Sequence, residues 1–273
     1  MKVYESLDDW RAARRALSGR IGFVPTMGAL HRGHASLIER SVAECDVTVL
    51  SIYLNPTQFN NPDDLAHYPR TLEADLDMAR ELGVDVVVTP TYDALYPDGY
   101  RYRVEEGEFS GELCGAHRPG HFTGVLTVVM KLLNLVRPDR AYFGEKDYQQ
   151  FELIRGMADA FFLDAEIVPC RTVREADGLA LSSRNALLDA EGRRLAPRFH
   201  CLLRSPESDA AVRERLARAG FEVDYVETRH GRRFGAVTVH GRTRDVRLID
   251  NVPAPATARS DDAAGVLPGA VNA

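Results

Sequence analysis

The chain has 273 residues, of which 45% are hydrophobic, and carries a formal charge of −6 at pH 7. This length and composition allow a sizeable core in one large domain or two modest ones, and the negative charge argues against nucleic-acid binding as the main function. There is no long apolar run, no signal-peptide shape at the start, and no paired CxxC spacing among Cys45, Cys114, Cys170 and Cys201. We therefore expect a cytoplasmic protein with reduced thiols and with no membrane or nucleic-acid partner.

The N-terminal part predicts a short strand at residues 3–4 and a helix from about residue 7 to residue 17, which Ser6 can cap. An apolar strand follows at residues 21–24. It should end at about Pro25, because proline has no backbone N–H to donate to a neighbouring strand.

A loop follows this strand, and the apolar positions beyond it predict a helix from about Gly33. Such a junction directs backbone N–H groups and the positive end of a helix dipole into the loop, which suits a phosphate. His31 and His34 lie beside the loop, and Gly33 between them lets an anionic group approach the backbone. The alternative is a pair of ordinary surface or core histidines, but the preceding strand and the letters PTMG favour the phosphate site.

Residues 47–54 are apolar and rich in β-branched side chains, which predicts a second strand buried on both faces. Strand, helix and strand in this order predict a Rossmann-like α/β domain, with a parallel sheet and helices on both faces. Ligands of such sheets bind beyond the carboxyl ends of the strands, so PTMGALHRGH and NPTQF should meet in one cleft. Gln58 in that cleft offers donors and acceptors to a small ligand, although alone it would be an ordinary turn residue.

The rest of the chain continues the alternation of helices and strands, with helices expected at 71–82 and after His121, and strands at 84–90, 140–143 and 164–170. The segment GEKDYQQ opens a further helix after the strand at 140–143. Lys146 in this segment can balance phosphate charge, although a solvated surface lysine is the ordinary alternative. Gln149 and Gln150 point into or away from the cleft according to the register of the helix.

The loop DGLALSSRN follows the strand at 164–170. Ser182, Ser183 and Arg184 would be good donors to a phosphate. The loop could also act as a mobile lid. The alternative is that these residues form an ordinary helix cap. The chain has no GxSxG motif, which would have indicated a serine hydrolase.

Seven motifs in chain order resemble those of the pantoate–β-alanine ligase family, within the nucleotidylyl-transferase superfamily with its HxGH arrangement: PTMGALHRGH, NPTQF, YPRTLEADL, RPGHFTGVLTVV, GEKDYQQ, DGLALSSRN and RLIDN. The resemblance implies a reaction in two steps. Pantoate and MgATP would form pantoyl adenylate and pyrophosphate, and the amine of β-alanine would then give pantothenate and AMP. A carboxylate that attacks the α-phosphate needs charge stabilisation rather than a protein nucleophile, and imidazoles, an ammonium and helix N-termini can supply it.

The resemblance also implies the site residues. His31, His34 and Lys146 would be catalytic, and ATP would be surrounded by Met27, His31, His34, Gly144, Glu145, Lys146, Asp147, Val173, Leu181, Ser182, Ser183 and Arg184. Pantoate would be held by Gln58 and Gln150, with Asn55, Arg118 and His121 nearby. Asp75 would approach a Mg²⁺ ion.

By the same resemblance, residues 1–175 would form the ATP- and pantoate-binding domain, and residues 176–252 a small C-terminal α+β domain that covers the site of a homodimeric enzyme. That second domain looks shortened around PRFHCLLRSPESDAAV, which leaves open a paralogue acting on a related acid or amine. A nucleotide-binding module without catalysis is a third possibility, against which His31, His34 and Lys146 count. The tail, 253–273, has few large apolar residues and is expected to be disordered.

Overall fold

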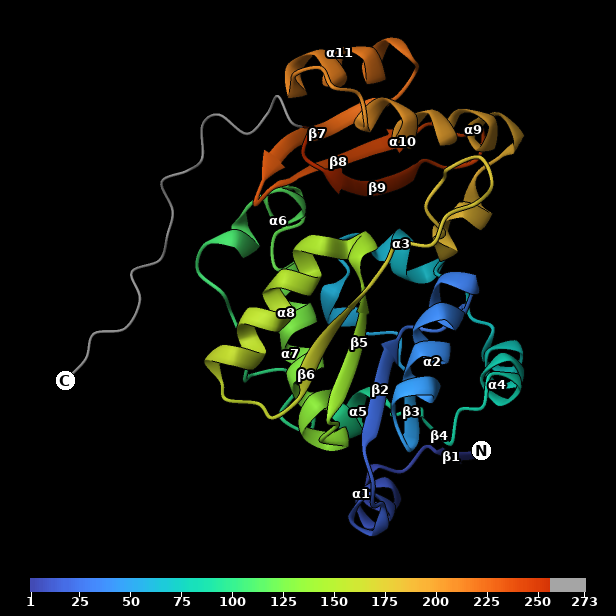
Figure 1. Cartoon of the computed structure of the whole chain (residues 1–273), viewed down its shortest axis with the longest axis vertical. Helices are drawn as coiled ribbons and strands as arrows, with labels where there is room; N and C mark the ends of the chain where they lie inside the picture. Colours follow the sequence, from blue (N-terminus) through green and yellow to red (C-terminus); the bar gives the residue numbers. More distant parts are fainter. Residues whose placement is uncertain (256–273) are drawn as a thin grey trace, which may run out of the picture. The chain divides into compact units, whose positions relative to one another are not determined.

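The computed structural model describes residues 1–255, which form two compact units that divide between Leu187 and Leu188 (Figure 1). The division lies beyond the expected boundary at residue 175, so residues 176–187 belong to the first unit rather than to the second. Pro253, the first residue of the expected tail, instead ends a strand. The remainder of that expectation, from residue 256 onward, lies outside the described residues.

The first unit is built on a six-stranded sheet in the order β1-β4-β3-β2-β5-β6, in which every pairing is parallel. Its strands are β1 (Lys2–Tyr4), β2 (Ile21–Thr26), β3 (Val47–Ile52), β4 (Val86–Val88), β5 (Arg140–Gly144) and β6 (Glu166–Cys170). From β2 the chain moves to β3 on one side, and later returns to place β5 on the other side. The carboxyl ends of β2 and β5 therefore flank the topological switch point, where open α/β sheets bind ligands.

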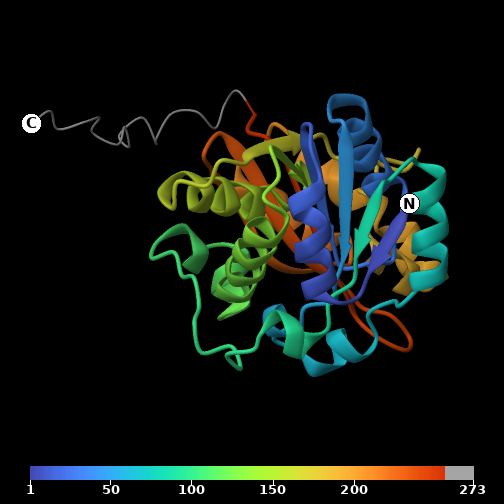
Figure 2. The same ribbon diagram turned by 90° about the horizontal axis from the view of Figure 1, so that it is seen from below.

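Five longer helices cover the two faces of this sheet (Figures 1 and 2): α1 (Leu7–Ala16), α2 (Arg32–Glu44), α4 (Leu72–Glu81), α7 (His121–Val136) and α8 (Tyr148–Ala160). Right-handed crossovers place α2 and α4 on one face and α1, α7 and α8 on the other. The short helices are α3 (Pro62–Ala66), α5 (Tyr92–Leu95) and α6 (Cys114–His117), with 3₁₀ turns η1 (Pro56–Gln58), η2 (Phe109–Gly111), η3 (Glu145–Asp147) and η4 (Ser183–Leu187). The predicted Rossmann-like α/β fold is confirmed.

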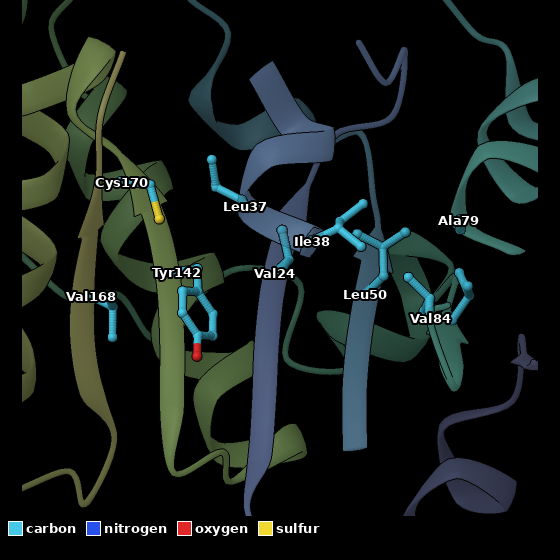
Figure 3. Packing of buried hydrophobic residues seen from close by; sticks show 10 residues of the cluster. Val24, Leu37, Ile38, Leu50, Ala79, Val84, Tyr142, Val168 and Cys170 are labelled. Carbon is cyan, nitrogen blue, oxygen red and sulfur yellow. The ribbon is translucent and has the colours of Figure 1, made fainter. Parts of the chain in front are cut away.

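The core on the α2 face joins the middle of the sheet to two helices. Val24 of β2 and Leu50 of β3 pack with Ile38 of α2 and Ala79 of α4, all of them fully buried (Figure 3). This packing explains why β2 and β3 are apolar nearly throughout, since the opposite face of the sheet is covered as well.

β2 continues through Pro25 to Thr26, one residue beyond its expected end. Ile21 of β2 accepts from the backbone N–H of Asp139, so the odd-numbered residues of this strand turn their backbone groups toward β5. Pairing on that side ends at Phe23, opposite Ala141. Pro25 therefore sits in the strand without removing a hydrogen bond of the ladder.

The second unit has an antiparallel sheet in the order β7-β8-β9, with three helices, and confirms the predicted small C-terminal α+β part. Its elements are α9 (Ala190–Leu195), α10 (Pro197–Leu203), α11 (Asp209–Arg218), β7 (Glu222–Arg229), β8 (Arg232–Val239) and β9 (Val246–Pro253). The motif RLIDN lies in β9, where Asp250 bonds His200 at 2.9 Å and Asn251 accepts from Arg232 at 2.6 Å. These bonds tie β9 to α10 and β8. In the described part of the chain, no helix is long and apolar enough to cross a membrane.

Candidate active site

A cavity of about 240 Å³ lies in the first unit, lined by the segments that follow β2, β3, β5 and β6 and by one side of α7. This is the expected cleft at the carboxyl ends of the strands. The lining includes all but two of the predicted site residues: Met27, His31, His34, Asn55, Gln58, Arg118, His121, Gly144, Lys146, Asp147, Gln150, Val173, Leu181, Ser182, Ser183 and Arg184. The exceptions are Glu145 and Asp75.

The two histidines of the HxGH motif cap the start of α2 together. Nδ1 of His31 accepts from the backbone N–H of Gly33 at 3.0 Å, and Nδ1 of His34 accepts from the backbone N–H of His31 at 3.3 Å. Because both Nδ1 atoms accept, each neutral ring carries its proton on Nε2. The pair therefore has two N–H donors left for a ligand.

Both rings are held neutral at physiological pH. Burial, then the neighbouring charge of His31, lowers the pKa of His34 to about 3. Burial, followed by the charge of Lys146, also lowers the pKa of His31 from its ordinary value. The histidines thus donate hydrogen bonds without adding full positive charge, and the cationic charge near them comes from Lys146.

Gly33 is required by the imidazole of His31. A Cβ atom at this position would lie 2.7 Å from Cε1 and 2.9 Å from Nδ1 of that ring. From the sequence, we expected this space to admit a bound anion. In the structure the space holds the capping histidine, so the glycine shapes the donor pair.

Asp75 lies outside the cavity lining and holds the loop between β2 and α2. Its carboxylate is only 3% exposed, and it accepts from the backbone N–H of Ala29 at 2.9 Å, the backbone N–H of Leu30 at 2.8 Å and the hydroxyl of Thr71 at 3.1 Å. The first two bonds fix the loop between β2 and α2, and the third joins the carboxylate to the residue before α4. A carboxylate can accept more than these three bonds, so the contact of Asp75 with Mg²⁺ stays a prediction.

The cationic side of the cavity is formed after β5 and β6. Lys146, at the turn η3, has its Nζ atom 3.6 Å from Oδ1 of Asp147, and both residues line the cavity. Glu145 of the same turn does not line it. Arg184, in the loop after β6, forms a two-pronged ion pair with Asp64 at 2.8 and 3.2 Å, and lies over the ring of Tyr68.

Gln58 and Asn55 follow β3, line the cavity and are hydrogen-bonded to each other. The Asn55 amide, 1% exposed, donates to Oε1 of Gln58 at 3.0 Å, and its oxygen accepts from the hydroxyls of Thr57 and Tyr96. Asn55 therefore positions Gln58, since its own oxygen and nitrogen are already bonded. Nε2 of Gln58 lies 3.2 Å from the sulfur of Met27, a weak acceptor, so a ligand oxygen can replace it.

His121 and Arg118 both bond to the backbone oxygen of Gln58. Nδ1 of His121 donates to the backbone oxygen of Gln58 at 2.8 Å, and Nε2 accepts from Arg118 at 3.1 Å. Burial, then the charge of Arg118, lowers the pKa of His121 to about 3, in agreement with a neutral ring that donates at one nitrogen and accepts at the other. Both residues line the cavity, and both also fix the turn that carries Gln58.

Gln150 and Gln149 lie in the first turn of α8 and point in different directions. Gln150 lines the cavity. Gln149 is buried elsewhere, accepting from the backbone N–H of Cys114 and donating to the backbone oxygens of Phe109 and Glu112. The register of α8 therefore directs Gln150 toward the cavity and Gln149 away from it, which the sequence had left open.

Sequence reasoning missed the apolar and aromatic part of the lining: Tyr53, Phe59, Tyr68, Val125, Val128, Val129, Leu132, Tyr142 and Phe143. The spacing 125, 128, 129, 132 is one stripe of α7, and it could have been recognised as a helix face turned to the cleft. Arg171 and Thr172, directly after β6, were also missed, although they occupy the same strand-end position as the residues that were identified. A small ligand with an apolar portion fits this wall.

Comparison with known proteins agrees with this geometry. A family model described as pantoate-beta-alanine ligase matches residues 1–253. A pantothenate synthetase from Coxiella burnetii is 52% identical over 253 residues, covering 92% of this chain and 96% of that protein, and one from Bdellovibrio bacteriovorus is 53% identical over 251 residues. The chain belongs to the pantoate–β-alanine ligase family.

Solved structures agree with membership of the pantoate–β-alanine ligase family. A ligase from Francisella tularensis, complexed with β-γ ATP and β-alanine, superposes with a TM-score of 0.86 at 40% identity and covers 93% of this chain and 97% of its own. A pantothenate synthetase from Thermus thermophilus gives 0.82 and is covered over 99% of its length. Because nearly the whole length of each solved chain is matched, the C-terminal part of this chain is not substantially shortened relative to them, contrary to the expectation from the sequence. As a family member, the chain is an enzyme.

Proposed function

We propose that this enzyme condenses pantoate with β-alanine to pantothenate, with ATP as co-substrate and pantoyl adenylate as the intermediate. The observation that carries the proposal is the meeting of two sets of groups in one cavity. Neutral imidazole donors and Lys146 form a polar side suited to phosphate, and Gln58 and Gln150 adjoin an apolar wall suited to a small branched hydroxy acid. The names of the relatives support the proposal, as does the complex of the Francisella ligase with β-γ ATP and β-alanine.

In the first step, a carboxylate oxygen of pantoate attacks the α-phosphorus of ATP, and the bond to the pyrophosphate oxygen breaks. Negative charge grows on the phosphate oxygens as this happens. Nε2–H of His31 and of His34, together with the ammonium of Lys146, would stabilise that charge. Donors fixed by helix capping need no reorganisation during the reaction, which is the main requirement for electrostatic catalysis.

In the second step, the amine of β-alanine attacks the acyl carbon of the adenylate, the bond to the AMP oxygen breaks, and the amine loses a proton. Gln58 and Gln150 would hold the pantoyl hydroxyls, with the stripe of valines on α7 against the methyl groups. Arg118 and His121 would act by fixing Gln58.

ATP would enter with its Mg²⁺ ion as part of the substrate. Within residues 1–255, no group of three histidine, cysteine or acidic side chains is placed to hold a metal. Mg²⁺ is commonly held by substrate phosphates with few protein ligands, which suits a site of this kind, and we derive no step through the ion.

We also propose that the enzyme is a cytoplasmic homodimer, as the family resemblance implies. Light scattering at several protein concentrations tests the assembly, and a monomer at all of them would contradict it. Fractionation of cells that express the chain tests the location.

The mechanism is tested by exchange of labelled pyrophosphate into ATP. Exchange should require pantoate but no β-alanine, because the first step is complete without the amine. Exchange that appears only with β-alanine would contradict the adenylate mechanism. A panel of related acids and amines, with AMP formation as the readout, separates this function from that of a paralogue with another acid or amine.

A further inference from the structure

Arg184 is held in the cavity wall by a residue that does not itself line the cavity. Asp64 of α3 accepts from Nε of Arg184 at 3.2 Å through one carboxylate oxygen and from Nη2 at 2.8 Å through the other. The pair joins two loops that are 120 residues apart in the sequence. Its side chains are only 26% and 31% exposed for Arg184 and Asp64, so solvent weakens the pair less than it would weaken a surface pair.

Two further contacts fix the same loops to each other. The hydroxyl of Tyr68 lies 3.1 Å from that of Ser183, and the guanidinium of Arg184 lies 5.7 Å from the centre of the Tyr68 ring. The rings of Phe59 and Tyr68 lie 5.8 Å apart between centroids in an edge-to-face arrangement. Arg184 is thus held by its ion pair with Asp64 and by its contact with the Tyr68 ring.

The ion pair engages Nε and Nη2, and Nη1 remains outside it. Arg184 lines the cavity together with Ser182, Ser183 and Lys146. A guanidinium that is already paired and stacked loses less side-chain freedom when it binds a phosphate than a free arginine does. Because Asp64 lies outside the cavity lining, its charge orients the arginine and does not occupy the place of the anion.

We propose that Asp64 is a positioning residue for ATP, which acts by presenting Arg184 to the phosphates. This inference rests on the proposed function, since it takes the anion in this cavity to be ATP. Neither composition nor motif spacing identified Asp64, because the segment NPDDL has the composition of a polar loop.

The test is the affinity for ATP, measured by titration calorimetry without pantoate, for wild type and Asp64→Asn. The variant should bind ATP roughly 3- to 10-fold more weakly, the cost of ordering one long side chain. Its kcat at saturating ATP should stay near wild type, so the change appears in KM. Asp63→Asn is the matched control, because it removes the same charge from an exposed neighbouring position on α3 and should leave ATP binding unchanged.

A double-mutant cycle shows whether Asp64 acts through Arg184. In an Arg184→Ala background, Asp64→Asn should have almost no further effect on the affinity for ATP. A full additional loss there would overturn the proposal, as would unchanged or tighter ATP binding in the single variant, since tighter binding would mean that Asp64 competes with phosphate. Asp64→Ser serves as a second variant should Asp64→Asn melt early. Failure of the proposed function would look different, because wild type would then not exchange pyrophosphate into ATP with pantoate, whatever the effect of Asp64→Asn on ATP binding.

Discussion

The rings of His31 and His34 lie 4.1 Å apart between centroids, and each uses Nδ1 to cap a backbone N–H at the start of α2. This reciprocal capping gives each histidine two separate tasks. One nitrogen of each ring stabilises the helix start, and the other is presented to the cavity.

The two tasks of His34 can be separated by substitution. In His34→Asn, the amide oxygen can still accept from the backbone N–H of His31, but the distal donor is lost. We expect adenylate formation to fall roughly 10²- to 10³-fold, as when one preorganised donor is removed, with a melting temperature near wild type. His34→Gln can place an amide donor near the position of Nε2, and should keep more activity at lower stability. Pyrophosphate exchange and thermal melting measure both effects, and an Asn variant within threefold of wild type would contradict the donor role.

His121 should make stability depend on pH. Its pKa is lowered to about 3 in the folded protein by burial, then by Arg118, whereas in the unfolded chain it is about 6.5. Below pH 6.5 the unfolded state therefore binds a proton that the folded state does not, and the free energy of unfolding falls by up to about 1.4 kcal/mol per pH unit. This loss continues until the pH approaches the folded pKa.

Replacing His121 should remove this part of the pH dependence. His121→Asn can keep a donor to the backbone oxygen of Gln58 but cannot titrate, so its free energy of unfolding should decline less steeply between pH 6.5 and 4.5. Denaturant titrations at several pH values measure the slopes. His67→Asn, at an exposed histidine, is the control. Parallel curves for His121→Asn and wild type would show that this histidine does not titrate as the structure implies.

Asp75 of α4 should act as a structural support for the loop before α2. Asp75→Asn leaves one acceptor oxygen for Ala29 and Leu30 in place of two, and turns an amide donor toward the other N–H. The free energy of unfolding should fall by about 1–3 kcal/mol, the cost of an unsatisfied buried donor. Activity should fall with it, and a purely structural role predicts an unchanged Mg²⁺ concentration for half-maximal activity. Asp77→Asn, at an exposed position of the same helix, is the control, and a shifted Mg²⁺ requirement would instead support a contact of Asp75 with the ion.

The sequence was sufficient to place the cleft, because two apolar strands with a helix between them predict a parallel sheet and because ligands bind at its carboxyl edge. Loops that immediately follow strands, such as those carrying His31 and Lys146, were therefore found. The pairing of Asp64 with Arg184 was not, since the two residues are 120 positions apart in the sequence and only the folded chain brings them together. The bonds of Asp75 to the amides of Ala29 and Leu30 were not predicted either, because about 45 residues separate it from that loop. The family resemblance alone had suggested its contact with Mg²⁺.

Lys146 should be needed for chemistry more than for folding. Lys146→Ala should slow adenylate formation roughly 10²- to 10³-fold, the range for loss of one group that stabilises developing charge. Lys146→Arg should rescue only part of the rate, because a planar fork cannot take the place of a compact ammonium. Lys2→Ala, at an exposed lysine, is the control. Single-turnover rates within about threefold of wild type for the alanine variant would leave Lys146 as a surface charge.

The adjacent glutamines of α8 offer a matched pair of substitutions with opposite expected results. Gln150 lines the cavity, so Gln150→Ala should raise KM for pantoate roughly 3- to 10-fold, the value of about one hydrogen bond, at an unchanged melting temperature. Gln149 instead makes three buried hydrogen bonds to the backbone around η2 and α6. Gln149→Ala should therefore lower the free energy of unfolding by about 1–3 kcal/mol, because buried backbone groups lose their partners, and should leave KM for pantoate near wild type. Initial-rate kinetics and denaturant unfolding of both variants test the assignment together. If Gln149→Ala raised KM and Gln150→Ala lowered stability, the register of α8 against the cavity would be wrong by one residue.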